Sequence, residues 1–496
     1  MIQPSFHEFK KLARKGNLIA LRMEVPSDLE TPVSAFLKLA AKEPCAFLLE
    51  SVEQEERIGR YSFLGFSPEA VLTARGSELF LTRRTRRVSL GKGGGILNLL
   101  RQMLSKYHLA NPEGFPSFIG GFVGFLGYEN VRHFEKVRLR DKNGLPPEDA
   151  VFFLVKEFLL FDHFKKTLSI ISLCETKEKN ESALRRAYKQ AIQKMQRIAA
   201  GLEQELPRQK REIPAAQTDS LIRPNFSKKE FEKRIRRIKE YIRAGDCIQV
   251  VFSQRFALGR VRDDFAIYRS LRSINPSPYM FYLRYGPLRL IGSSPELLVR
   301  KTGRMAEVRP IAGTRIRGRT SAEDLKLEEN LRRSKKEMAE HLMLVDLGRN
   351  DLGRVCRFNS IRVNDFATVE RYSHVMHLVS GITGHLKPGK DAFDVLKVTF
   401  PAGTVTGAPK IRAMEIIDEL EPEKRGAYAG SLGYFSFTQD IDMCITIRTI
   451  VVTKGRAYVQ AGAGVVYDSQ PSKEYRETLN KACALIQAVQ HGKAGA

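Results

Sequence analysis

Short apolar runs separated by turn residues occur along most of this sequence, and they limit the fold to one built on β-sheets. The run at 119–128 is rich in glycine and aromatic residues, as in a strand against which another backbone packs closely. A Lys454–Gly455 turn joins the last two runs as an antiparallel pair. We predict strands at 47–51, 61–66, 119–128, 150–162, 168–173, 247–256, 279–285, 290–293, 297–301, 427–437, 442–452 and 457–466.

Helical periodicity appears between these runs. Leu184, Ala187, Ala191 and Met195 recur at helical spacing within a charged segment. We predict helices at 176–205, 227–244, 322–346, 410–419 and 473–490. Antiparallel sheets with helices outside them predict an α+β fold.

The length of 496 residues favours two or more domains over a single core. Pro207, Pro214 and Pro224 stand among polar residues, which is typical of a linker. We place this linker at 206–225, between an N-terminal part at 1–205 and a C-terminal part at 226–496.

Composition excludes several classes of protein. The apolar fraction of 43% is ordinary, no apolar run is long enough to span a membrane, and the N-terminus lacks a signal-peptide pattern. The six cysteines are scattered without a C-x-x-C pair, which favours a reducing compartment and argues against a zinc site. We therefore expect a cytoplasmic protein with no membrane partner.

The net charge of +26 suggests nucleic acid as a partner. No nucleic-acid-binding motif accompanies the charge, however, and the basic residues are spread along the chain. An acidic substrate or an acidic partner subunit suits the charge equally well. We do not expect nucleic-acid binding.

Two pairs of glutamates at helical spacing suggest a divalent cation. Glu474 and Glu477 share one helix face with Lys481, just after the glycines at 462 and 464, and Glu337 and Glu340 form the second pair. Carboxylates from two helices suit Mg²⁺, which keeps water and substrate oxygens as further ligands. The alternative is a pair of solvated helix faces, and spacing alone does not show whether the two pairs meet.

Other motifs fail. The segment 403–410, G-T-V-T-G-A-P-K, is not a phosphate-binding loop, because Ala408 and Pro409 separate its last glycine from Lys410. No G-x-S-x-G or G-x-C-x-G pattern is present, so neither a serine hydrolase nor a glutaminase nucleophile is predicted.

Several longer motifs together resemble the chorismate-utilising enzymes, and among them the anthranilate synthase component I family most closely. The resemblance covers about residues 40–70 and 225–490. The motifs are G-D-C-I-Q-V-V-F-S-Q-R-F (245–256), I-G-S-S-P-E-L-L (291–298), R-P-I-A-G-T-R (309–315), E-H-L-M-L-V-D-L-G-R-N-D (340–351), S-H-V-M-H-L-V-S-G (373–381) and P-A-G-T-V-T-G-A-P-K (401–410).

The resemblance implies two interleaved parts with large antiparallel sheets flanked by helices, and an Mg²⁺-dependent chorismate site in the catalytic part, 226–496. It makes Glu340 and Glu477 metal ligands, with Glu337 and Glu474 in or near the outer shell. It assigns catalytic roles to Glu296 as general acid, to His377 in pyruvate elimination and to Thr404 beside the ring. It assigns substrate binding to Gly313, Thr314, Tyr428, Arg448, Gly462, Ala463, Gly464 and Lys481.

Two positions select among the chorismate enzymes. Gln249 stands where the isochorismate and salicylate synthases have a lysine base, and an amide cannot take a proton from water. Ala312 stands where aminodeoxychorismate synthases typically have a nucleophilic lysine. Both favour direct amination at C2 and hence anthranilate; aminodeoxychorismate synthesis, or nucleic-acid binding on this scaffold, are the alternatives.

The N-terminal part, 1–205, resembles the regulatory part of the same family. Its L-L-E-S element and the later N-P-S-P-Y-M segment match a tryptophan feedback site, which makes Glu50, Ser51, Pro278, Tyr279 and Met280 inhibitor-binding residues. Chorismate and ammonia are the expected substrates. A separate glutamine amidotransferase subunit is expected to supply the ammonia.

Overall fold

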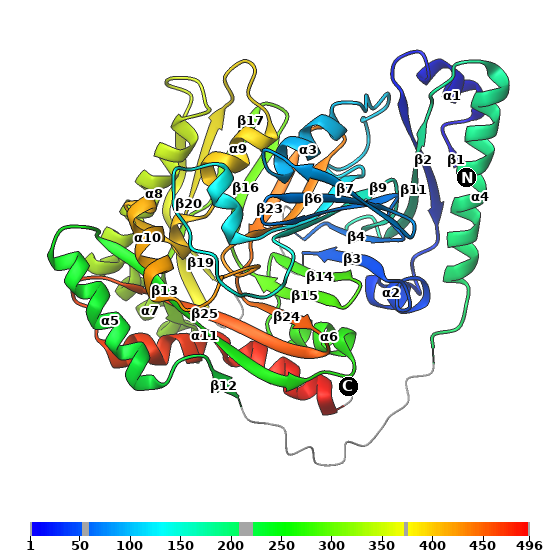
Figure 1. The fold of residues 1–496 in the computed structure, drawn as a ribbon. Helices are drawn as coiled ribbons and strands as arrows, with labels where there is room; N and C mark the ends of the chain where they lie inside the picture. The colour runs from blue at the N-terminus through cyan, green and yellow to red at the C-terminus, as the bar shows by residue number, and fades with distance from the viewer. Residues whose placement is uncertain (1, 52–58, 208–221, 372–374, 495–496) are drawn as a thin grey trace.

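The computed structural model describes residues 2–51, 59–207, 222–371 and 375–494. Two large antiparallel sheets form the centre of the molecule, and helices surround them (Figure 1). The predicted α+β class is therefore confirmed.

The first sheet joins strands from both ends of the chain. Its N-terminal half and its C-terminal half meet where β3 pairs with β14, with Glu50 opposite Met280. In spatial order the strands are β1 (Ile2–Gln3), β2 (Leu18–Val25), β11 (Thr167–Glu175), β10 (Glu157–Asp162), β4 (Tyr61–Phe66), β3 (Cys45–Glu50), β14 (Tyr279–Tyr285), β15 (Leu288–Ser294), β24 (Thr449–Thr453), β25 (Arg456–Val465), β13 (Gln249–Arg260) and β12 (Arg223–Pro224), with β21 (Gly407–Ala408) beside β13.

The second sheet has the same mixed origin. Its halves meet where β8 pairs with β22. On the other side of β8, a Cβ on Gly124 would lie 1.9 Å from the carbonyl oxygen of Val151 in the adjacent β9, so only glycine fits. In spatial order the strands are β18 (Ile311–Ile316), β20 (Val375–His385), β17 (Met305–Val308), β16 (Leu297–Thr302), β23 (Ile441–Ile445), β22 (Ser431–Ser436), β8 (Gly121–Leu126), β9 (Ala150–Val155), β5 (Ala70–Arg75), β6 (Glu78–Arg83) and β7 (Arg86–Lys92), with β19 (Arg362–Arg371) beside β20.

Helices cover the outside of this pair of sheets. In Figure 1, α1 and α4 lie at one end of the molecule and α5, α8 and α10 at the other. None of the described helices is long and apolar enough to cross a membrane. The α-helices are α1 (Phe6–Leu12), α2 (Pro32–Leu39), α3 (Ile96–Leu104), α4 (Glu181–Leu202), α5 (Lys228–Arg243), α6 (Asp264–Ile274), α7 (Ser321–Arg333), α8 (Lys335–Gly353), α9 (Ala392–Thr399), α10 (Lys410–Leu420) and α11 (Pro471–Ala494), and 3₁₀ turns occur at η1 (Tyr128–His133) and η2 (Gly403–Val405).

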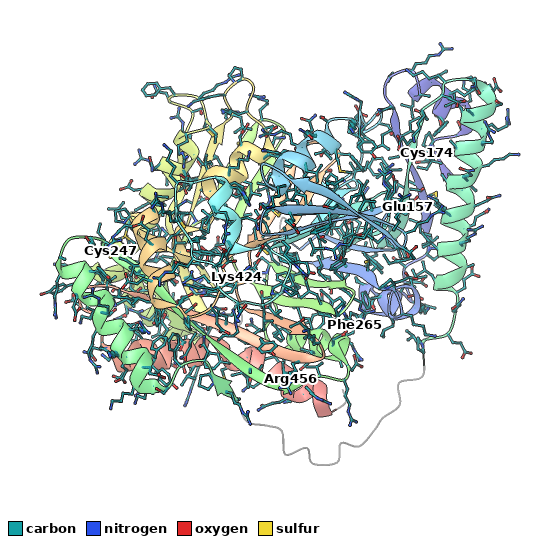
Figure 2. All side chains as sticks on the ribbon, in the orientation of Figure 1. Glu157, Cys174, Cys247, Phe265, Lys424 and Arg456 are labelled. Carbon is teal, nitrogen blue, oxygen red and sulfur yellow. The ribbon has the colours of Figure 1, made fainter. Side chains whose placement is uncertain are left out.

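Two large hydrophobic cores hold the layers together. One lies between the sheets and extends beneath α3, α8 and α9, and the other lies on the far face of the first sheet beneath α1, α2, α4, α6 and α11. Phe265 of α6, labelled in Figure 2, belongs to the second core and stacks on Phe36 with ring centroids 4.0 Å apart. Burial of this apolar surface is the main force that holds the helices on the sheets.

Local capping signals fixed several helix ends as predicted. Ser227 caps α5 by accepting the backbone N–H of Glu230, whose side chain returns a bond to Ser227. The helix predicted at 322–346 is wrong as a single element, because Ser334 is extended and ends α7 while its hydroxyl caps α8 at Glu337. The S-K-K-E sequence there is itself a capping signature.

Two strands predicted as single elements cross from one sheet to the other. The run at 150–162 divides into β9 and β10 at the buried Lys156, and the run at 442–452 divides into β23 and β24. The strand predicted from Ala427 begins only at Ser431, since Ala429 has a left-handed backbone with φ of 61°. Apolar composition alone does not distinguish one long strand from two consecutive strands in different sheets.

The predicted boundary at 206–225 falls largely outside the described residues, because 208–221 are not among them. On its far side, Arg223–Pro224 already pairs with β13. Both sheets contain strands from 1–205 and from 226–496, so the two parts share their sheets; the domain limits themselves stay a prediction.

Candidate active site

The carboxylates predicted from sequence lie on the first two turns of two helices. In α8, Glu337 accepts an ion pair from Arg315 at 3.2 Å, and Glu340 accepts a hydrogen bond from the side chain of Gln249 at 3.2 Å. In α11, Glu474 is buried, and Glu477 is paired with Lys481 at 2.7 Å. Helix N-termini favour the negative charge of Glu337 and Glu474, which lie in the first turn, through free backbone N–H groups.

Mutual electrostatics show that the two pairs face a common region. Burial raises the pKa of Glu340, and Glu337 raises it further; burial and then Glu477 raise the pKa of Glu474. Lys481 of α11 lowers the pKa of Glu340, and Lys336 of α8 lowers that of Glu474. Each helix therefore lies within the electrostatic reach of the other, which the sequence could not show.

The four carboxylates do not converge on one point as the ligands of a bound metal ion would. Within residues 2–51, 59–207, 222–371 and 375–494, no three His, Cys, Asp or Glu side chains converge closely enough to form a metal-binding group. The donor set still suits a hard divalent cation, since it offers four carboxylates, of which Glu474 is buried and the other three are partly buried. The assignment of Glu337, Glu340, Glu474 and Glu477 as metal ligands stays a prediction.

Strand β25 supplies Gly462 and Gly464, and neighbouring side chains lie too close to these positions for any residue larger than glycine. A Cβ on Gly462 would lie 2.7 Å from the hydroxyl of Tyr428, and a Cβ on Gly464 would lie 2.7 Å from the amide nitrogen of Gln249. Lys481 donates to the carbonyl of Gly462 at 3.0 Å. Tyr428, Gln249 and Lys481 thus meet β25 at Gly462–Gly464.

Arg448 lies in the segment where the chain passes from β23 to β24. Its backbone is left-handed, with φ of 49°, and its side chain is half-buried. Burial lowers its pKa, while Tyr428 and Glu477 oppose that change. Among the residues that the structure describes, no hydrogen bond or ion pair engages its guanidinium. A partly buried guanidinium without a carboxylate partner suits an anionic ligand.

His377, Gly313 and Thr314 meet where β18 pairs with β20. Nδ1 of His377 lies 2.9 Å from the carbonyl oxygen of Gly313 and 3.1 Å from the Thr314 hydroxyl. A carbonyl only accepts, so Nδ1 carries the proton and Nε2 holds the lone pair of the neutral ring. Burial lowers the pKa of His377, and Arg448 and Lys481 lower it further, so the ring is neutral near pH 7.

Glu296 lies between β15 and β16 with 7% of its surface exposed. Burial raises its pKa to about 8, against smaller opposing effects from Thr404 and Lys481. The Thr404 hydroxyl makes no hydrogen bond of ordinary geometry with any described residue, although it lies beside this carboxyl. Both residues line the same open hollow. Glu296 is thus protonated near neutral pH, as a general acid requires.

The residues predicted to bind tryptophan meet at the junction of β3 and β14. Glu50 pairs across the strands with Met280, and its buried carboxylate receives a hydrogen bond from Tyr268 and an ion pair from Arg272 at 3.2 Å. The Ser51 hydroxyl is buried without a partner among the described residues. Sequence reasoning missed Tyr268 and Arg272, which belong to no motif.

Tyr279 and Pro278 continue this region into the interior. The Tyr279 hydroxyl donates to Asp442 at 3.0 Å and accepts from Arg300 at 3.0 Å, while Pro278 is buried. The structure therefore brings Glu50, Ser51 and 278–280 together, although the two segments are far apart in the sequence.

Known proteins resemble this chain over nearly its full length. A family model described as chorismate binding enzyme matches residues 44–487. The anthranilate synthase component 1 of Synechocystis sp. is 46% identical, covering 99% of each chain. The solved anthranilate synthase component I from Streptococcus pneumoniae TIGR4 has a TM-score of 0.72 at 34% identity, covering 93% of this chain and 98% of that one. The menaquinone-specific isochorismate synthase from Escherichia coli has the same TM-score of 0.72 at 19% identity, covering 97% and 99%, and shows the shared fold alone.

Proposed function

The chain belongs to the family of chorismate binding enzymes, and we propose that it is the chorismate-converting component of an anthranilate synthase. This proposal rests on one observation: the chain is 46% identical to an anthranilate synthase component 1 in an alignment that covers 99% of the chain. The reaction combines chorismate and ammonia and releases anthranilate, pyruvate and water, which makes the enzyme a lyase of tryptophan biosynthesis.

The environment of Gln249 supports amination over hydration. Its amide donates to Glu340 at 3.2 Å, so the side chain is held at the edge of the site, and it has no basic lone pair with which to activate water. Ala312 is buried in β18 next to Gly313 and offers no nucleophile. Ammonia brings its own lone pair and needs no base before it attacks C2.

Carboxylate recognition falls to Arg448, Tyr428 and the backbone of Gly462–Gly464. The guanidinium of Arg448 is available for a bidentate bond to a substrate carboxylate. The open backbone at Gly462 and Gly464 allows a ligand to approach the strand closely. These groups fix the orientation of the ring before the chemistry begins.

Glu340, Glu474 and Glu477, with Glu337 beside them, are the residues that would hold Mg²⁺. When bound, the ion supplies positive charge at the ring carboxylate and so organises the elimination electrostatically.

Two residues move protons in this proposal. Glu296, protonated at neutral pH, gives its proton to the C4 hydroxyl, which leaves as water while ammonia bonds to C2. His377, with Nδ1–H held by Gly313, presents Nε2 to accept the C2 proton as the enolpyruvyl group leaves. Loss of that proton and of pyruvate produces the aromatic ring.

Ammonia and regulation complete the proposal. A glutamine amidotransferase subunit supplies ammonia, since no glutaminase nucleophile motif occurs in this sequence. Tryptophan binds at Glu50, Ser51 and 278–280 as a feedback inhibitor, and the enzyme acts in the cytoplasm. The unpartnered Ser51 hydroxyl and the meeting of two distant segments support the inhibitor site.

Product analysis tests the proposal directly. Purified protein is incubated with chorismate, Mg²⁺ and ammonium, and the products are separated and identified. We expect fluorescent anthranilate and pyruvate in equal amounts. A 4-amino product would instead indicate aminodeoxychorismate synthesis, and isochorismate or salicylate would show that water attacks. Glutamine is expected to replace ammonium only after a glutaminase subunit is added.

A further inference from the structure

Arg425 lies in the loop after α10, and only 2% of its surface is exposed. Its guanidinium donates to the carbonyl of Val405 at 2.6 Å and to the carbonyl of Val251 at 2.7 Å. It also donates hydrogen bonds to both carboxylate oxygens of Glu421, at 2.9 and 2.7 Å. A planar cation with five donors in fixed directions can make all these bonds at once, whereas lysine cannot.

Both carbonyls belong to segments that hold residues of the chorismate site. Val405 follows Thr404 in η2, and Val251 lies in β13 two residues after Gln249. The guanidinium carbon lies 5.5 Å from the ring centre of Tyr428. One buried cation therefore contacts three separate segments that surround the substrate position.

Glu421 extends these contacts to β25. Its Oε1 accepts the backbone N–H of Ser253 at 2.9 Å and the Ser253 hydroxyl at 2.8 Å. Ser253 is the cross-strand partner of Gly462, and its hydroxyl also receives a bond from Gln460 at 2.8 Å. The carboxylate thus neutralises Arg425 and joins it to the strand that carries the glycines of the site.

Residues of the N-terminal part also bind the loop that contains Arg425. Glu129 accepts the backbone N–H of Arg425 at 2.8 Å and that of Gly426 at 3.1 Å. The neighbouring Lys424, labelled near the middle of the molecule in Figure 2, forms a backbone bridge with Gly144. The loop is therefore held between the two parts of the chain.

We propose that Arg425, with Glu421, is a positioning residue of the chorismate site that sets Thr404, Gln249 and Tyr428 at their working separations. Arg425 touches no reacting atom and acts through the carbonyls and the ring that it contacts. A small shift of such segments costs rate because the reacting groups lose their alignment. The inference rests on the proposed function, since it concerns the same site.

A merely structural role is the competing explanation, and the chain contains a matched control. Arg284 on β14 is 7% exposed, pairs with Asp264 at 3.3 Å and donates to the carbonyls of Ala40, Ala41 and Glu43. Its guanidinium carbon lies 5.4 Å from the ring of Tyr282. None of these partners belongs to the chorismate site, so Arg284 reports the cost of disturbing a buried arginine elsewhere.

Arg425→Lys and Arg284→Lys are compared by thermal unfolding and by steady-state kinetics with chorismate, Mg²⁺ and ammonium. We expect similar losses of Tm, but a kcat for Arg425→Lys at least about tenfold lower than that of Arg284→Lys, one factor of ten being ~1.4 kcal/mol of barrier. Added guanidinium is expected to restore turnover to Arg425→Ala and not to change Arg284→Ala. Equal kcat losses in both lysine variants, or no selective rescue, would overturn the proposal.

If Arg425→Lys does not fold, Glu421→Gln and Asp264→Asn provide the same comparison with smaller changes. A larger kcat loss in Glu421→Gln supports the positioning role, and equal losses refute it. If wild-type protein converts chorismate to another product, the proposed function fails, while the same comparison of kcat still decides the role of Arg425.

Discussion

The two proposed ligand regions of this molecule differ in whether their charged side chains are paired with a counter-charge. In the chorismate region the Arg448 guanidinium has no partner among the described residues. There, burial and a neighbouring carboxylate on the same helix raise the pKa of Glu340 on α8 and that of Glu474 on α11. In the proposed tryptophan region the buried Glu50 carboxylate is satisfied by Tyr268 and Arg272. The first region lacks counter-charges that a substrate and a cation would bring, whereas the buried charge of the second is already paired without its ligand.

This difference has an energetic consequence. Unpaired or mutually repelling buried charges cost folding free energy, and a ligand that supplies the missing charges recovers it as binding energy. A region whose charges are already paired gains less from a ligand, which then acts by favouring one arrangement over another. We therefore expect large effects of substitution in the first region on activity and smaller effects in the second on regulation.

The largest effect is expected for the proposed metal ligands. Glu340→Ala or Glu477→Ala is expected to lower kcat by about a thousandfold or more, since the ion contributes several kcal/mol of transition-state stabilisation. Asp346→Ala is the control, because Asp346 lies on the same helix with 61% of its side chain exposed. Addition of Mg²⁺ is also expected to raise the Tm of wild-type protein but not of either glutamate variant. Near-native activity of either variant at limiting Mg²⁺ would refute the assignment.

Arg448→Gln is expected to separate stability from activity. The KM for chorismate should rise about a hundredfold, because two charge-assisted hydrogen bonds of about 1.5 kcal/mol each are lost. The free energy of unfolding, measured in urea, should stay constant or increase, since a partly buried cation without a partner among the described residues is removed. Glu50→Gln instead removes a buried charge that is already paired, and it should lower the free energy of unfolding by about 1–2 kcal/mol. Equal destabilisation by both variants would contradict the contrast between the two regions.

The pKa of Glu296 predicts a pH dependence of both activity and stability. Turnover requires the protonated carboxyl, so kcat should fall tenfold per pH unit above about 8. Between the ordinary glutamate value of 4.5 and about 8, the folded protein holds a proton that the unfolded chain releases. Stability relative to Glu296→Gln should therefore decrease as pH rises through that window and level off above it. A difference in stability that does not vary with pH would show that Glu296 is ionised in the folded state.

Much of the secondary structure could be predicted because its signals are local. Ser227 and Glu230 mark the start of α5, and the strand at 61–66 has the predicted bounds. The divisions at 150–162 and 442–452 could not be predicted, because both halves of each run are apolar and only tertiary packing assigns them to different sheets.

The sequence proposed the site residues one by one, and these assignments stay predictions; the electrostatic environment of the residues could not be predicted. Motifs identified Glu296 and Arg448, whereas the raised pKa of Glu296 and the missing partner of Arg448 depend on burial by distant segments. The contact between Gln249 and Glu340 joins positions 91 residues apart. Sequence reasoning did not single out Arg425, because its partners in the site segments are the backbone carbonyls of Val251 and Val405, which have no residue identity to recognise.

The smallest effect on turnover is expected in the tryptophan region. Tryptophan should lower the affinity for chorismate, and chorismate should lower the affinity for tryptophan by the same factor, with a coupling of about 1–3 kcal/mol. The chain contains no tryptophan, so all indole fluorescence in a titration comes from the ligand. Binding is therefore measured directly, with and without chorismate.

Ser51→Phe should weaken this inhibition and leave turnover without tryptophan nearly unchanged, because the added ring fills the space beside a hydroxyl that is buried without a partner. Ser51→Ala is the matched control; it removes the same hydroxyl without adding volume and should alter inhibition less. If wild-type protein ignores millimolar tryptophan, the regulatory assignment is wrong. If Ser51→Phe loses catalysis in parallel with inhibition, the segment at 48–51 serves only as a strand of the first sheet, and the two regions do not differ in the way proposed.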